Sequence, residues 1–180
     1  MDSMTSYHPI RVVDGVLLQQ LRSGRTMEDW RRYLVQLETA GIIYGGIVVR
    51  PGAGSSHSPA AAAAGGGGYV KTNGWTHDVA ELAALRKEMT ARAKIAATEP
   101  RSVEVQGEQF GVRPAPAESA TPASGRTTLV GVCKAARTCV AAALAVDGSL
   151  VVAIGALSAG DAASARCVRE VQWIADMCGP

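Results

Sequence analysis

The side chains that most often carry chemistry are few in this sequence, and their spacing fits neither catalysis nor metal binding. Four cysteines stand at positions 133, 139, 167 and 178, with no Cys-x-x-Cys pair and with all three histidines upstream of them. Zinc sites need clustered Cys and His ligands, so we expect no metal site and instead reduced, half-buried thiols. The GxSxG elbow of serine hydrolases and the GxxxxGK[ST] phosphate loop are both absent.

The other ionisable residues give no catalytic pattern either. His77 is the only histidine in a segment that we expect to be ordered, and its place at a helix start favours capping or solvent exposure. Asp161, Glu170 and Asp176 share the last predicted helix without forming an acid and base pair. The sequence therefore predicts a protein that is not an enzyme and needs no cofactor.

A small set of large side chains points to binding instead. Trp30 and Tyr33 stand about one turn apart on the first predicted helix, and Trp173 shares the last predicted helix with Met177. Trp173 falls outside the apolar stripe of its helix, so it either packs against a neighbouring helix or is exposed for binding. If the two helices lie side by side, the four residues form one aromatic patch, which suits the preformed helix of a proline-rich ligand.

Length, charge and hydropathy narrow the class of protein. A chain of 180 residues is expected to form one domain. Its 18 basic and 16 acidic residues leave a net charge of +2, too balanced for a nucleic-acid binder that works by counterion release. We find no basic cluster for membrane-surface binding, no apolar run of the roughly 20 residues that span a bilayer, and no secretory signal. A cytosolic location is the expectation that remains.

Apolar spacing and turn residues divide the chain into an extension, residues 1–25, and one domain, residues 26–180. Thr26 is expected to cap a helix that ends at Gly41, and Thr76 or Asp78 to cap a second one. Strands are predicted at 42–50, 69–73, 102–108, 109–115, 127–134, 138–146 and 149–155, followed by a helix from Ser158 or Asp161 to about Cys178. Residues 52–68 read as a flexible insertion and 114–125 as a loop. This order predicts an α+β fold with an antiparallel sheet.

Four of these segments resemble the profilin family, and together they span about residues 26–178. TMEDWRRYL is similar to the family's first helix, with Trp30 and Tyr33 at its Trp and Tyr positions. VEVQGEQFGVRPA resembles its strand pair with a Q-G-E turn, and VGVCKAARTCVAAAL resembles the following hairpin. SARCVREVQWIADMC is similar to its C-terminal helix.

The resemblance implies a central antiparallel sheet with the N- and C-terminal helices on one face and a further helix on the other. It implies a cytoplasmic, cytoskeletal adaptor that regulates actin polymerisation by binding actin monomers and proline-rich proteins. The proline-rich ligand would contact Trp30, Tyr33, Trp173 and Met177. The actin monomer would contact Arg113, Lys134 and Arg137.

Two other functions fit the same order of elements. A roadblock- or longin-like scaffold subunit shares the layered plan but needs no helix after the last strand, where this sequence has a strong one. A profilin-shaped small-ligand domain should enclose a polar pocket, whereas Ala and Val dominate the apolar residues here.

Overall fold

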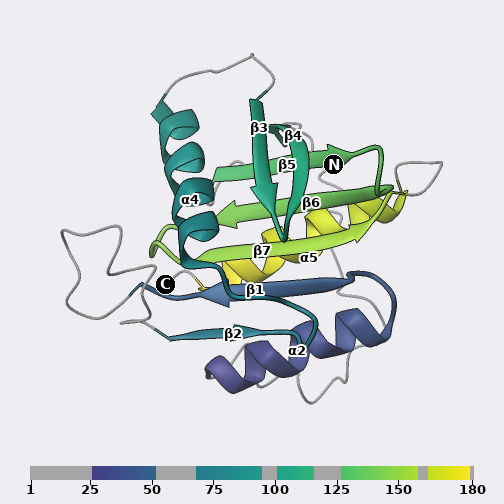
Figure 1. Cartoon of the computed structure of the whole chain (residues 1–180). Coiled ribbons are helices and arrows are strands. Elements are labelled where there is room, and N and C mark those ends of the chain that lie inside the picture. Colours follow the sequence, from purple (N-terminus) through teal and green to yellow (C-terminus); the bar gives the residue numbers. More distant parts are fainter. Residues whose placement is uncertain (1–25, 52–67, 95–100, 116–126, 158–161, 179–180) are drawn as a thin grey trace, which may run out of the picture.

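The computed structural model describes residues 26–51, 68–94, 101–115, 127–157 and 162–178, which form three helices and one seven-stranded antiparallel sheet (Figure 1). The α+β class predicted from the sequence is therefore correct. The predicted extension at 1–25, the insertion at 52–68 apart from Gly68, most of the loop at 114–125 and the cap candidates Ser158 and Asp161 lie outside the described residues.

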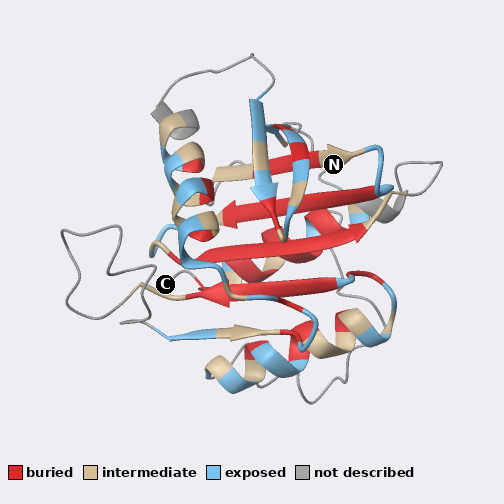
Figure 2. Ribbon diagram, viewed as in Figure 1, coloured by how far each residue is buried: buried red, intermediate tan, exposed pale blue. Residues whose placement is uncertain are grey.

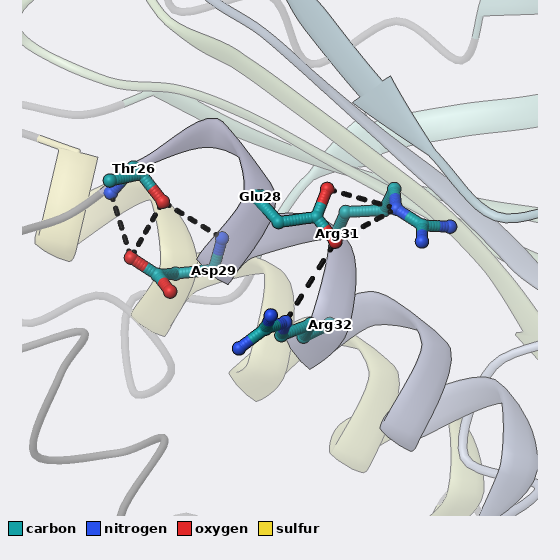
Figure 3. A network of polar contacts seen from close by, with 5 residues as sticks. All are labelled: Thr26, Glu28, Asp29, Arg31 and Arg32. Carbon is teal, nitrogen blue, oxygen red and sulfur yellow. Dashed lines mark hydrogen bonds and ion pairs between the residues drawn. The ribbon is translucent and has the colours of Figure 1, made fainter.

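The first helix, α2 (Met27–Thr39), begins and ends where its local sequence requires. Thr26 and Asp29 form a capping box, in which the Asp29 amide donates to Thr26 Oγ1 at 3.2 Å and the Thr26 amide donates to Asp29 Oδ2 at 2.9 Å (Figure 3). The Asp29 carboxylate accepts from the Thr26 amide and also from the Thr26 hydroxyl at 2.8 Å, and these two bonds, the backbone one first, hold the pKa of Asp29 below its ordinary value. Gly41 ends the helix with φ +71°, a conformation that glycine adopts without strain. Thr26 and Gly41 are thus confirmed as the helix boundaries.

The sheet has the strand order β2-β1-β7-β6-β5-β4-β3, and every neighbouring pair is antiparallel. The strands are β1 (Gly45–Val49), β2 (Tyr69–Lys71), β3 (Arg101–Val105), β4 (Glu108–Pro114), β5 (Thr127–Cys133), β6 (Thr138–Leu144) and β7 (Leu150–Ala156). Because β1 pairs with β7, the first and last strands of the chain lie side by side in the middle of the sheet.

The strand boundaries differ from the predicted ones where the backbone forms turns instead of pairing with a neighbouring strand. The strand expected at 42–50 starts only at Gly45, because the Ile42 and Ile43 amides bond back to the Leu37 carbonyl at the end of α2. The strand expected at 102–108 stops at Val105, because Gln106 and Gly107 have positive φ and make a two-residue hairpin turn. The loop expected from residue 114 starts later, because Pro114 still belongs to β4 opposite Leu129 on β5.

The second helix, α4 (Val79–Lys94), is tied at its start to the β3–β4 turn. Asp78, one of the two predicted caps, accepts from the amides of Ala80 at 2.9 Å and Glu81 at 3.1 Å. The side-chain amide of Gln106 pairs with the Thr76 backbone through two hydrogen bonds of 2.7 Å. The backbone N–H of Gln106 donates to Glu81 Oε1 at 2.8 Å. These contacts hold the Q-G-E turn against the start of α4.

Two apolar clusters lie on the two faces of the sheet. One contains α4 residues such as Leu85 and Met89, together with Phe110 of β4. The other contains residues of α2 and of α5 (Ala162–Cys178), including Trp30 and Cys167. Figure 1 shows α4 in front of the sheet and α5 behind it, and Figure 2 shows that β6 and β7 between them are buried over almost their whole length.

Gly131 on β5 provides a test of how tightly the α4 face is packed. A Cβ there would lie 2.7 Å from Val140 Cγ1, 2.8 Å from Val112 Cγ1 and 2.9 Å from Phe110 Cβ. Gly131→Ala should therefore overpack the core and lower the free energy of unfolding by about 1–3 kcal/mol in urea denaturation. Gly111 on β4 is the matched control, because a Cβ added there would meet nothing within 4 Å. Equal midpoints for the two variants would contradict the described packing.

Candidate functional site

The seam between α2 and α5 brings together the aromatic residues that the sequence singled out. The ring centroid of Trp173 lies 5.0 Å from that of Tyr33 and 6.2 Å from that of Trp30. Trp30 and Tyr33 meet edge to face, with centroids 6.4 Å apart. Such distances are those of stabilising aromatic pairs, so the three aromatic residues form one structural unit. Met177 lies one turn after Trp173 on α5 and packs against the larger core cluster that contains Trp30 and Tyr33. We call these four residues the aromatic seam.

The four members of the aromatic seam differ in how much of each side chain solvent can reach. Trp30 and Tyr33 are 0% exposed, whereas Trp173 and Met177 are only partly buried. Tyr33 is therefore as buried as Trp30, and both rings belong to the core. The accessible part of the aromatic seam is provided by α5, and the two α2 rings lie beneath it.

A buried hydrogen bond joins the two helices within the aromatic seam. Tyr33 Oη donates to Glu170 Oε2 at 2.5 Å, and Glu170 is 0% exposed. Sequence reasoning noted Glu170 only as one of three carboxylates on the last helix that show no acid and base pair. Its complete burial is unusual for a Glu side chain. The one available signal was its spacing: Glu170 precedes Trp173 by three residues, so both lie on the same side of α5. Because a buried carboxyl group costs free energy unless it is hydrogen-bonded, this bond favours an arrangement of α2 and α5 in which Tyr33 and Glu170 face each other.

The three basic residues expected to contact actin are all exposed, but they do not form one group. Lys134 and Arg137 belong to the four-residue turn between β5 and β6. Arg113 lies on β4 opposite Val130, four residues before Lys134 along the neighbouring strand. At a rise of about 3.3 Å per residue, Arg113 is about 13 Å from the turn. The structure therefore brings two of the three residues together.

An acidic cleft of about 430 Å³ lies between α4 and β3, and sequence reasoning missed it. Asp78, Glu81, Glu88 and Glu104 line it, and Arg101 bonds Glu88 at 3.3 Å. Burial raises the pKa of Glu81, and the hydrogen bonds from Gln106 oppose that rise. Within the described residues, no three His, Cys, Asp or Glu side chains lie close enough together to hold a metal ion, and no helix is long and apolar enough to cross a bilayer.

Removing one hydroxyl group tests the buried contact. Tyr33→Phe should lower the free energy of unfolding by about 1–3 kcal/mol, because the variant keeps the ring and loses the hydrogen bond to a fully buried carboxyl group. Thermal and urea denaturation measure the change. Tyr44→Phe is the matched control, since Tyr44 is 57% exposed and should unfold like the wild type. A Tyr33→Phe variant as stable as this control would show that the bond contributes nothing.

Known proteins resemble this chain only distantly. No protein-family model matches the chain, and no curated protein matches it significantly. Among solved structures, the crystal structure of rat profilin 2a is similar, with a TM-score of 0.43 and 12% sequence identity over 84% of this chain and 98% of that one. We base no assignment on a similarity of this size.

Proposed function

We propose that this chain is a divergent adaptor of the profilin type, with a profilin-like fold, that binds proline-rich segments at the aromatic seam. The observation that carries the proposal is the meeting of Trp30, Tyr33 and Trp173 between two helices that share one face of the sheet. The resemblance of the TMEDWRRYL, Q-G-E and C-terminal helix segments to profilins supports it. A proline-rich peptide has a stiff backbone, so it loses little entropy when it docks on aromatic rings.

Burial within the aromatic seam suggests how such a ligand would engage. Trp173 and Met177 are the members that solvent reaches, so they would make the first contact. Among the described residues, the buried indole Nε1 of Trp30 meets no hydrogen-bond acceptor. A peptide carbonyl that reached this nitrogen would supply the missing acceptor, and buried polar groups gain from being paired. The proposed ligand therefore combines flat apolar contact with carbonyl acceptors.

The C-terminal helix also bears on the competing functions. α5 follows the last strand and packs along β6 and β7, whereas a roadblock-like scaffold does not need a helix at that place. The strands beneath it contribute small apolar side chains to the core, among them Ala141, Ala143 and Ala153. This favours an adaptor over a domain that encloses a polar ligand. In keeping with the proposed adaptor role, we propose a cytoplasmic, cytoskeletal location and no catalytic activity.

Trp173→Ala should lower the affinity for a polyproline peptide by about tenfold or more, because aromatic anchors are common hot spots of binding. The α5 stripe of Cys167, Val171 and Ile174 stays in place, so the variant should keep its circular dichroism spectrum and most of its stability. Isothermal titration calorimetry measures binding without relying on the removed fluorophore. Trp30→Ala is expected to lose both binding and stability, since Trp30 belongs to the buried core.

Three results would count against this half of the proposal. Proline-rich ligand binding would be excluded if the wild-type protein did not bind polyproline at millimolar peptide concentration. It would also be excluded if the protein bound polyproline and a Gly-Ser peptide of the same length equally well. A Trp173→Ala variant that unfolds would assign Trp173 to the core rather than to a binding surface.

Binding to monomeric actin is the second half of the proposal, with Lys134 and Arg137 in the β5–β6 turn and Arg113 at a distance from them. Exposed charges at the rim of an interface act mainly on the association rate. Lys134→Glu should therefore slow association with actin in a pyrene-actin assay, more strongly at low salt. Lys87→Glu on α4 is the matched control, because Lys87 is also an exposed lysine. Identical rates for both variants at low salt would exclude Lys134, and wild-type protein without actin affinity would overturn actin binding altogether.

A further inference from the structure

Two buried thiols meet where α5 crosses the sheet. Cys139 lies on β6 and Cys167 on α5, both are 0% exposed, and both belong to the same core cluster, where neither forms a disulfide. The two side chains are close enough for Cys139 to raise the pKa of the Cys167 thiol. The Sγ of Cys139 lies 3.7 Å from the Ala156 carbonyl oxygen, and the Sγ of Cys167 lies 3.8 Å from that of Ala153. Both thiols are therefore held against β7 as well as against each other.

Gly155 on β7 makes this approach possible. It is the Cα partner of Cys139 in the β6–β7 ladder, and facing residues of an antiparallel pair lie about 4.5–5.5 Å apart. A Cβ on Gly155 would lie 3.2 Å from Cys167 Cβ and 3.3 Å from Cys167 Sγ. Cys167 thus occupies the space that Gly155 leaves open, directly beside Cys139. Cysteines whose Cβ atoms approach closely are the ones that a disulfide can join without moving the backbone.

We propose that Cys139 and Cys167 form a redox modification site, at which a low-molecular-weight disulfide such as oxidised glutathione converts them to an intramolecular disulfide between β6 and α5. The thiolate of one cysteine attacks the glutathione disulfide, forms a mixed disulfide and releases one glutathione thiolate. The thiolate of the other cysteine then attacks the protein sulfur of the mixed disulfide and releases the second. Two protein thiols lose two protons and two electrons, and one glutathione disulfide becomes two glutathione thiols.

The surroundings of the pair make this reaction slow and its product well protected. The neighbouring Cys139 side chain, burial and the charge of Glu170 all raise the pKa of the Cys167 thiol well above its ordinary value. Because the thiolate is the attacking species, the closed structure reacts little, and exchange requires α5 to open locally. Sub-denaturing urea should therefore speed the oxidation. After closure the disulfide is buried, and it covalently holds α5 on the sheet.

The distribution of cleavage sites allows a direct test. The four cysteines fall in four different tryptic peptides, spanning residues 127–134, 138–166, 167–169 and 170–180. The folded wild-type chain is brought to equilibrium in glutathione redox buffers, quenched with acid, alkylated and digested without reduction. Mass spectrometry then identifies every pairing. We expect peptide 138–166 to be joined to peptide 167–169. The amount of this linked pair should be at least about tenfold greater than in the same chain oxidised in concentrated guanidinium chloride, where the two cysteines are no longer held close together.

Matched variants separate this pair from the other thiols. Cys133→Ser should retain the cross-link, because Cys133 is a half-buried thiol of β5 outside the pair. Cys167→Ala should abolish it. The proposal would be wrong if Cys139 and Cys167 were not linked at equilibrium in the folded wild-type protein. Both cysteines would then be alkylated as thiols once the protein is denatured. A dominant disulfide at Cys133 or Cys178 would overturn it as well, and neither result depends on whether a variant folds.

Discussion

The packing of α5 on β6 and β7 is the contact on which the other features of this structure depend. The strands present small side chains to the helix, among them Ala141, Ala143 and Ala153, and Gly155 presents none. A helix can approach such a surface closely, and close packing is what gives a core of small residues its dispersion energy. With α5 seated on one face and α4 on the other, β6 and β7 are buried on both sides.

The position of α5 in turn decides what α2 meets. α2 contacts β1 and β2 rather than the centre of the sheet, so its inner side faces α5 along one edge. The aromatic seam fills the space between the two helices. The hydrogen bond between Tyr33 and Glu170 lies in the same place, and a buried carboxylate is costly unless it is paired. Apolar packing brings the helices together, and this polar contact selects their relative position.

On the opposite face, the Q-G-E turn connects a local sequence signal to long-range structure. Gln106 and Gly107 adopt positive φ because the hairpin requires it. The Gln106 side chain then pairs with the Thr76 backbone and its amide with Glu81, which ties the end of the β3–β4 hairpin to α4. The Q-G-E turn, which the sequence analysis used only as a mark of resemblance, therefore also holds α4 against the edge of the sheet.

The sequence alone was enough to determine the α+β class, the order of the elements, the Thr26 cap and the Gly41 end of α2, because caps, turns and apolar periodicity act over a few residues. Strand ends were predicted less well, since the amides of Ile42, Ile43 and Gln106 donate to turn and loop contacts that depend on neighbouring elements. Whether a side chain is buried depends both on its place in its own helix or strand and on the element that packs against it. Only the tertiary structure could therefore decide that Tyr33 and Glu170 are fully enclosed, that Arg113 stands apart from Lys134, that carboxylates of α4 and β3 share a cleft, and that Cys139 and Cys167 meet over a glycine.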